Sequence, residues 1–297
     1  MEAVNVRIGL IDIDGKMPNI ALMKLSAYYK SKGYEVERTT PIMAGTYDKV
    51  FASKIFTWSA MPALPENAVI GGTGYDLSIE LFPEIDMLCP DYSLYPELNY
   101  SVGFLTRGCN RQCPWCFVPA KEGNIRPYMD IEEFAKHRDV VLLDNNVLAC
   151  EHGLRQLEKI GKYGFRIDFN QGLDARLIDD SVARLLAKIK WLKPVRLACD
   201  TVSVVPVVRK AIETLRWHNV HPSRYFVYML VTEDINSALE RAKFLKGMNV
   251  DPFAQPYRPP DGEEPGDIQK DFSRWVNHKA IFNSVEWENY KPKQSLA

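Results

Sequence analysis

Residues 101–123 read SVGFLTRGCNRQCPWCFVPAKEG, and this stretch decides the fold. Its apolar start, 101–105, predicts a short strand, because apolar runs bounded by turn residues are typical of buried strands. The loop behind it carries Cys109, Cys113 and Cys116 with C-x3-C-x2-C spacing, so half of the six cysteines fall within eight residues. In α/β barrels the catalytic groups sit on loops that follow the strands, so this loop is the first place to expect chemistry.

A strand–helix rhythm extends from this stretch toward the C-terminus. Six candidate strands begin near Ser101, Asp139, Arg166, Val195, Tyr225 and Val250, at intervals of 38, 27, 29, 30 and 25 residues. Such intervals are typical of βαβ steps of roughly 30 residues. Amphipathic helices are expected between the strands, at 131–137, 153–163, 181–190, 204–217 and 235–246. Six units predict a partial (β/α)6 barrel over 96–258, because a full barrel has eight.

The residues before this rhythm predict a smaller α/β domain. Short strands are expected at 6–11, 34–37, 49–53 and 68–70, with a helix after the first. This pattern is typical of an open, Rossmann-like sheet over 1–95. A stretch with Pro83, Pro90 and Pro96 is interpreted as the linker, and 259–297 as a C-terminal helical tail with a helix at 272–282.

Composition excludes several classes of protein. The 297 residues are 46% hydrophobic and 25% charged, which is too apolar for a disordered chain. The net charge of −1 argues against a large nucleic-acid surface. The run of Lys188, Lys190, Lys193 and Arg196 is interpreted as a solvated face. No apolar run reaches the roughly 18 residues of a membrane span, and the N-terminus does not resemble a signal peptide, so we expect a cytoplasmic protein that binds no membrane and has no disulfides.

The three clustered cysteines leave open which metal they bind. Structural zinc requires four ligands, and no histidine lies between residues 90 and 136. Iron–sulfur clusters usually take four thiolates, so three thiolates on a [4Fe–4S] cluster would leave one iron open to a ligand. A non-catalytic, zinc-stabilised binding module and an iron–sulfur electron-transfer protein are the alternatives to an enzyme.

The motif C-x3-C-x-aromatic-C, placed after the first strand of a six-unit barrel, resembles the radical SAM superfamily over residues 100–258. The resemblance implies that Cys109, Cys113 and Cys116 bind a [4Fe–4S] cluster, with Trp115 as the aromatic residue of the motif. It implies that S-adenosylmethionine binds the open iron and is cleaved reductively to a 5′-deoxyadenosyl radical. This radical would modify an unactivated carbon, by methylation or another reaction, of a biopolymer or natural product. An electron donor such as flavodoxin or ferredoxin would be the partner.

Other candidate cofactor-binding residues follow the later strands. Asp144 and Asn145, in the triplet 144–146, stand where the family binds the methionine amino group, although its Gly-Gly-Glu form is absent. Arg176 suits a carboxylate, and Asp200 could bind ribose hydroxyls because a charged residue that ends an apolar strand needs a partner. Gln171 and Tyr228 complete the candidate set.

The order of an open α/β domain, a Pro-rich linker and a barrel resembles the cobalamin-binding radical SAM group. The strings VIGGTG and PDYSLYPEL add to this resemblance. The sequence departs from the group because Asp-x-His-x-x-Gly is absent and no histidine precedes residue 137, which excludes an axial histidine from 1–95. Gly71–Gly74 is interpreted as a tight turn rather than a phosphate or corrin site. We keep cobalamin as an alternative to a degenerate domain that only shapes the substrate entrance.

Overall fold

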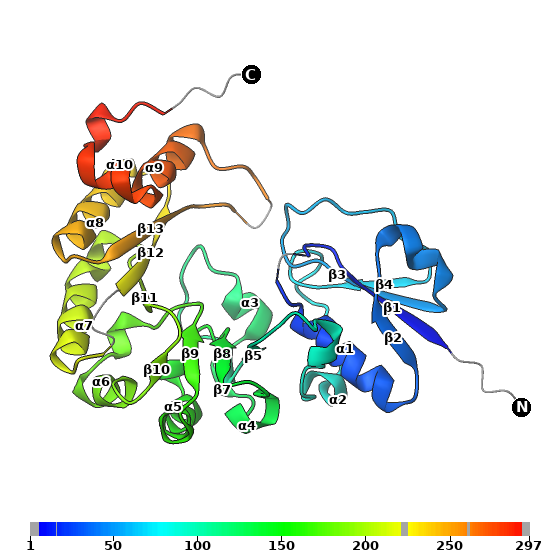
Figure 1. Cartoon of the computed structure of the whole chain (residues 1–297). Coiled ribbons are helices and arrows are strands. Elements are labelled where there is room, and N and C mark those ends of the chain that lie inside the picture. The colour runs from blue at the N-terminus through cyan, green and yellow to red at the C-terminus, as the bar shows by residue number, and fades with distance from the viewer. Residues whose placement is uncertain (1–5, 16, 221–224, 260–261, 293–297) are drawn as a thin grey trace, which may run out of the picture. The chain divides into compact units, whose positions relative to one another are not determined.

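The computed structural model describes residues 6–15, 17–220, 225–259 and 262–292. The chain divides into two compact units, Met1–Gly103 with Met129–Arg138, and Phe104–Tyr128 with Asp139–Ala297 (Figure 1). The domain boundaries that we predict at residues 95 and 258 stay predictions. No helix among the described residues is long and apolar enough to cross a membrane.

The first unit is built on an open parallel sheet, as predicted. Its strands are β1 (Arg7–Asp12), β2 (Glu35–Arg38), β3 (Lys49–Ser53) and β4 (Ala68–Gly71), in the order β2-β1-β3-β4. Helix α1 (Ile20–Ser31) connects β1 to β2, and Asn19 caps it by accepting from the Leu22 N–H. Ile11, Ala44, Val50 and Ala52 form one buried apolar cluster of this unit. The remaining elements of this unit are η1 (Pro41–Thr46), α2 (Pro83–Asp86), η2 (Tyr92–Leu94), β5 (Ser101–Gly103) and α4 (Ile131–Phe134).

The second unit begins with a hairpin that the sequence did not predict. Strands β6 (Thr106–Arg107) and β7 (Arg126–Pro127) pair antiparallel and enclose the cysteine loop with helix α3 (Val118–Glu122). Later in the chain, β8 (Asp139–Leu142), β9 (Arg166–Phe169) and β10 (Lys190–Trp191) pair in parallel.

A second parallel sheet follows, with β11 (Val195–Ala198), β12 (Tyr225–Val231) and β13 (Asp251–Pro256) in that order. Side chains alternate along β12 between buried and half-buried positions. An isolated parallel bridge, Leu173 to Leu197, connects the segment after β9 to β11. The six predicted strands all form, but a continuous partial barrel is not confirmed, because the described strands lie in separate sheets.

The helices of the second unit largely match the prediction. Figure 1 shows α7 and α8 along the outer side of β11 and β12. The ranges are η3 (Val147–Ala149), α5 (Glu151–Tyr163), η4 (Ala175–Leu177), α6 (Asp180–Leu186), η5 (Val202–Val204), α7 (Val205–Trp217), α8 (Ile235–Gly247), α9 (Asp267–Asn277), α10 (Lys279–Ser284) and η6 (Trp287–Asn289).

Four local predictions were wrong. The helix expected at 131–137 ends at Phe134, because the N–H groups of Lys136 and His137 donate to the Ser101 hydroxyl instead. The helix expected at 181–190 ends at Leu186, because Trp191 pairs with Ile167 as a strand and packs on the Phe169 ring at 5.2 Å. The helix expected at 272–282 is divided at His278, where the chain turns and brings the Phe282 ring 4.9 Å from Trp275. Arg196 does not lie on a solvated face, because it forms an ion pair with buried Asp168.

The glycine turn after β4 is tightly packed, which agrees with its interpretation as a turn. A Cβ atom at Gly72 would lie 2.3 Å from the Lys54 carbonyl oxygen, and one at Gly74 would lie 2.4 Å from the Phe56 carbonyl carbon. Backbone therefore fills the space that a ligand would need at these two glycines.

We expect Gly74→Ala to destabilise the protein by about 1–3 kcal/mol, because the added methyl group must displace backbone. Gly45→Ala is the matched control, since nothing lies within 4 Å of its Cβ position. Urea unfolding measures both variants. Equal midpoints for the two would contradict the close packing at Gly74.

Candidate functional site

The cysteine loop is tied closed at its base by one carboxylate. Glu122, at the end of α3, accepts a 2.8 Å hydrogen bond from the Gly108 N–H and pairs with the Arg107 guanidinium at 2.8 Å. The Asn145 amide donates to the same carboxylate at 3.1 Å. The Cys109 N–H also donates to the Gly123 carbonyl at 3.1 Å. These contacts hold together the two ends of the loop that carries the thiols.

Gly108 makes this closure sterically feasible. Its φ of +82° lies in the region that favours glycine, and a Cβ atom there would lie 2.3 Å from the Asn124 carbonyl oxygen. The chain therefore requires glycine directly before Cys109.

A second carboxylate fixes the strand that leads into the loop. Asp144 is 3% exposed and follows β8. One of its oxygens accepts hydrogen bonds from the Thr106 N–H at 2.6 Å and hydroxyl at 2.7 Å, and both oxygens lie 3.1 Å from the Leu105 N–H. Burial raises the pKa of Asp144 to about 6, and the hydrogen bonds oppose that rise.

The three thiols lie within electrostatic range of one another. Burial raises the pKa of Cys113 and Cys116 first, and the neighbouring thiols together with Asp200 raise both further. Cys109 and Cys113 are half-buried, and Cys116 is exposed. Asp200 follows β11, is half-buried, and accepts from the Leu230 N–H at 2.9 Å.

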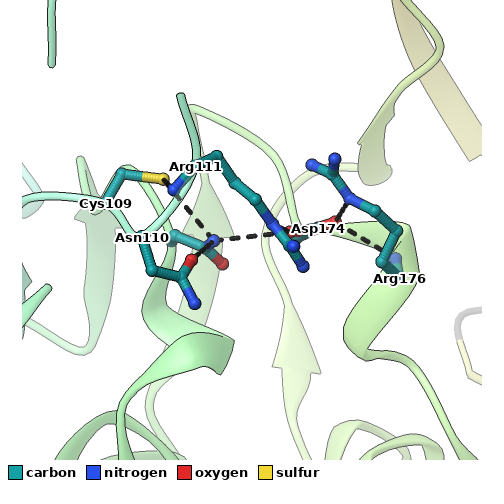
Figure 2. Close-up of polar contacts among 6 residues, drawn as sticks. Cys109, Asn110, Arg111, Asp174 and Arg176 are labelled. Carbon is teal, nitrogen blue, oxygen red and sulfur yellow. Dashed lines mark hydrogen bonds and ion pairs between the residues drawn. The ribbon is translucent and has the colours of Figure 1, made fainter. Parts of the chain in front are cut away.

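Two arginines and one aspartate lie beside the thiols. Asp174 accepts from the Arg111 guanidinium at 2.8 Å and from the Arg176 guanidinium at 2.6 Å (Figure 2). Burial raises the pKa of Asp174, but the hydrogen bonds from Arg176 and Arg111 outweigh it and hold the pKa below its usual value. Arg111 and Arg176 share the Asp174 carboxylate here, and Arg176 partly offsets the rise in the pKa of Cys113.

Asn146 is the member of the predicted triplet that reaches a thiol. It is 2% exposed, and its Nδ2 lies 3.6 Å from the Cys109 Sγ, 3.2 Å from the Asn110 Oδ1 and 3.4 Å from the Asp174 Oδ2. Its Oδ1 is buried and has no hydrogen-bond partner within the described ranges.

The structure thus gathers part of the predicted set around the thiols. The three cysteines, Arg176 and Asp200 come together, while Asp144 and Asn145 contact the ends of the cysteine loop. Trp115 is half-buried in the loop and Gln171 is exposed after β9. The Tyr228 hydroxyl donates to the Asn170 carbonyl at 2.9 Å. Sequence reasoning missed Glu122 and Asp174. Only Asp174 has a local signal, because it caps η4 two residues before Arg176.

No group of three His, Cys, Asp or Glu side chains in the described part of the chain is arranged to hold a metal ion. The donor set nevertheless fits an iron–sulfur cluster, because thiolates are its ligands and the Cys109 sulfur already accepts N–H groups from Arg111 at 3.4 Å and from Asn146.

Comparison with known proteins gives a similar fold among the solved structures. No family model matches the chain, and no curated protein matches it. A solved structure of the cobalamin-dependent S-adenosylmethionine radical enzyme OxsB, with aqua-cobalamin and S-adenosylmethionine bound, is similar with a TM-score of 0.57 and 11% identity. The match covers 94% of this chain and 56% of that one, so this chain spans little more than half the length of its neighbour. At this identity the likeness shows the fold.

Asp144 predicts a specific dependence of stability on pH. Its folded pKa of about 6 lies above the unfolded value near 3.8, so the folded state binds the extra proton between these values. The stability of the wild type relative to Asp144→Asn should therefore fall between pH 4 and pH 7, by up to about 3 kcal/mol. Asparagine also turns an N–H group toward Leu105, but that cost does not vary with pH.

Unfolding of the metal-free protein in urea at pH 4.5 and pH 7.5 measures this difference. A gap between wild type and Asp144→Asn that stays constant with pH would contradict a raised Asp144 pKa.

Gly108→Ala should destabilise the loop more than Gly123→Ala. Both glycines have positive φ, so alanine is strained at either position. Only Gly108 lies against backbone, and nothing lies within 4 Å of the Gly123 Cβ position. We expect a gap of about 1–3 kcal/mol between the two variants. Thermal unfolding checks it, and equal stabilities would contradict the contact with Asn124.

Proposed function

We propose that this protein is a radical SAM enzyme that binds a [4Fe–4S] cluster through Cys109, Cys113 and Cys116. The observation that carries the proposal is the closed loop that presents three thiols, with no fourth thiol in the motif, beside two arginines that share one aspartate. The similar fold of a radical SAM enzyme supports it. A partial barrel over 96–258 is part of this proposal.

The charged groups around the loop suit S-adenosylmethionine, which carries a carboxylate, an amino group and ribose hydroxyls. Arg176, 41% exposed and already polarised by Asp174, can bind the carboxylate. The unpartnered Asn146 Oδ1 can accept from the amino group. Asp200 stays the candidate for the ribose hydroxyls, with one oxygen held by the Leu230 N–H.

A bound, reduced cluster would supply the electron that breaks the C5′–S bond of S-adenosylmethionine. The protein's own residues hold this cofactor, orient it and exclude water from a reactive radical. An electron donor such as flavodoxin or ferredoxin and a substrate with an unactivated carbon complete the reaction that we propose. Methylation is one form that it can take.

The carboxyl edge of the first unit's sheet favours a corrinoid, and we include cobalamin in the proposal on that ground. The loops after all four strands expose large apolar side chains, and the rings of Phe56 and Trp58 stack at 4.8 Å. Ligands of open α/β sheets bind at this edge. The unit supplies no axial histidine there, because its one histidine, His137, bonds to Ser101. The exposed side chains are Met17, Ile42, Met43, Phe56, Trp58, Met61, Tyr75, Ile79 and Phe82.

Trp58→Ser should weaken the binding of hydroxocobalamin by at least about tenfold, because burying one large aromatic ring contributes more than about 1.4 kcal/mol. Trp217→Ser is the matched control, since Trp217 is 82% exposed in the other unit. Absorbance of the corrin after gel filtration measures retention. If the wild-type protein retains no corrinoid, cobalamin is removed from the proposal. If Trp58→Ser and Trp217→Ser lose the same amount of corrinoid, the corrinoid does not bind at the carboxyl edge of this sheet.

The cluster and its reaction have a direct test. After anaerobic reconstitution the wild type should bind about four irons with matching sulfide and form 5′-deoxyadenosine from S-adenosylmethionine and dithionite. Cys113→Ala should lose both properties. Cys150→Ala is the control, because this half-buried thiol lies outside the loop.

Each alternative function gives a different result in that test. About one zinc and no iron per chain would indicate a binding module. Four irons that yield no 5′-deoxyadenosine and do not respond to S-adenosylmethionine would indicate an electron-transfer protein.

A further inference from the structure

We propose that the side-chain amide of Asn146 sets the reduction potential of the cluster by donating a hydrogen bond to the Cys109 sulfur. This inference rests on the proposed function. It assigns a positioning and electronic role to a residue that touches a cluster ligand, separate from any contact with the cofactor.

The orientation of the Asn146 amide is determined by its surroundings. Three acceptors face its Nδ2, namely the Cys109 Sγ at 3.6 Å, the Asn110 Oδ1 at 3.2 Å and the Asp174 Oδ2 at 3.4 Å. A flipped amide would point its oxygen at all three, which is unfavourable because none of them can donate in its ionised or amide-oxygen form. The N–H groups of Asn146 therefore point toward the Cys109 sulfur and its neighbouring acceptors.

The environment favours this contact. Asn146 is 2% exposed, so little water competes for its N–H groups. Asp174 is itself anchored by Arg111 and Arg176, so it holds the amide in place while two guanidinium groups offset its charge. Cys109 also receives the Arg111 backbone N–H at 3.4 Å, which gives this sulfur two donors.

The direction of the effect follows from charge. Reduction adds an electron that spreads over the iron and its sulfur ligands, and N–H donors stabilise the more negative state. Hydrogen bonds to the sulfurs and nearby charge are among the factors that set cluster potentials. Loss of the Asn146 donor should therefore make the cluster harder to reduce.

Two variants test the proposal. Asn146→Leu removes the donor in a side chain of similar size, and Asn146→Asp keeps the shape but places an oxygen against the sulfur. Both should shift the midpoint potential to more negative values, and Asn146→Asp should shift it further because it adds negative charge. Asn124→Leu is the matched control, because Asn124 lies on the same loop with an exposed side chain.

The readout is a reductive titration of the reconstituted cluster, followed by electron paramagnetic resonance, with iron and sulfide measured for each variant. A full cluster with an unchanged potential in both Asn146 variants would overturn the proposal. A shift of equal size in Asn124→Leu would overturn it too, because a general disturbance of the loop would then explain the result. A wild type that binds no iron would instead refute the proposed function, so the two failures are distinguishable.

Discussion

The carboxylate of Asp144 accepts the N–H groups of Leu105 and Thr106 and the Thr106 hydroxyl, and the position of the cysteine loop depends on that interaction. Strand β6 is two residues long and would have little stability alone. The carboxylate fixes its backbone to the end of β8, at a cost in desolvation that appears as a raised pKa. At the other end of the loop, Glu122 closes it through Gly108 and Arg107.

The carboxylates of Asp144 and Glu122 act on the loop differently from the carboxylate of Asp174. Asp144 and Glu122 accept from the backbone that leads into the motif, so they determine where the thiols lie. Asp174 accepts from Arg111, Arg176 and Asn146, so it organises the groups that face the thiols. A loop that is held in this way keeps three sulfurs in fixed relation, which a cluster with one open iron requires. It also supplies cationic groups for an anionic ligand.

Elements with regular periodicity could be predicted from the sequence. Strand β3 and helices α5, α7 and α8 lie within two residues of their predicted bounds, because each has a strong apolar pattern. The β6–β7 hairpin could not be predicted, since two-residue strands have no periodicity and form only through contacts such as Asp144. The division of the last helix at His278 likewise depends on the packing of Phe282 against Trp275.

The candidate site likewise has residues that could be predicted from the sequence and residues that could not. The cysteine loop could be located because its spacing is local, and Arg176 and Asp200 were candidates because each follows a strand, β9 or β11. Asn146 was visible only as part of a polar triplet. Its contact with Cys109 depends on a loop that the sequence does not place. Glu122 gives no local signal, since a glutamate at the end of a short helix is ordinary until the fold brings Gly108 to it.

The central claim is that three cysteines hold a cluster whose fourth iron is open to S-adenosylmethionine. Electron paramagnetic resonance of the reduced, reconstituted protein, recorded without and with S-adenosylmethionine, tests it most directly. We predict that the cofactor changes the signal of the cluster, because it binds the open iron. A full four-iron cluster whose signal is identical in both samples would contradict the account.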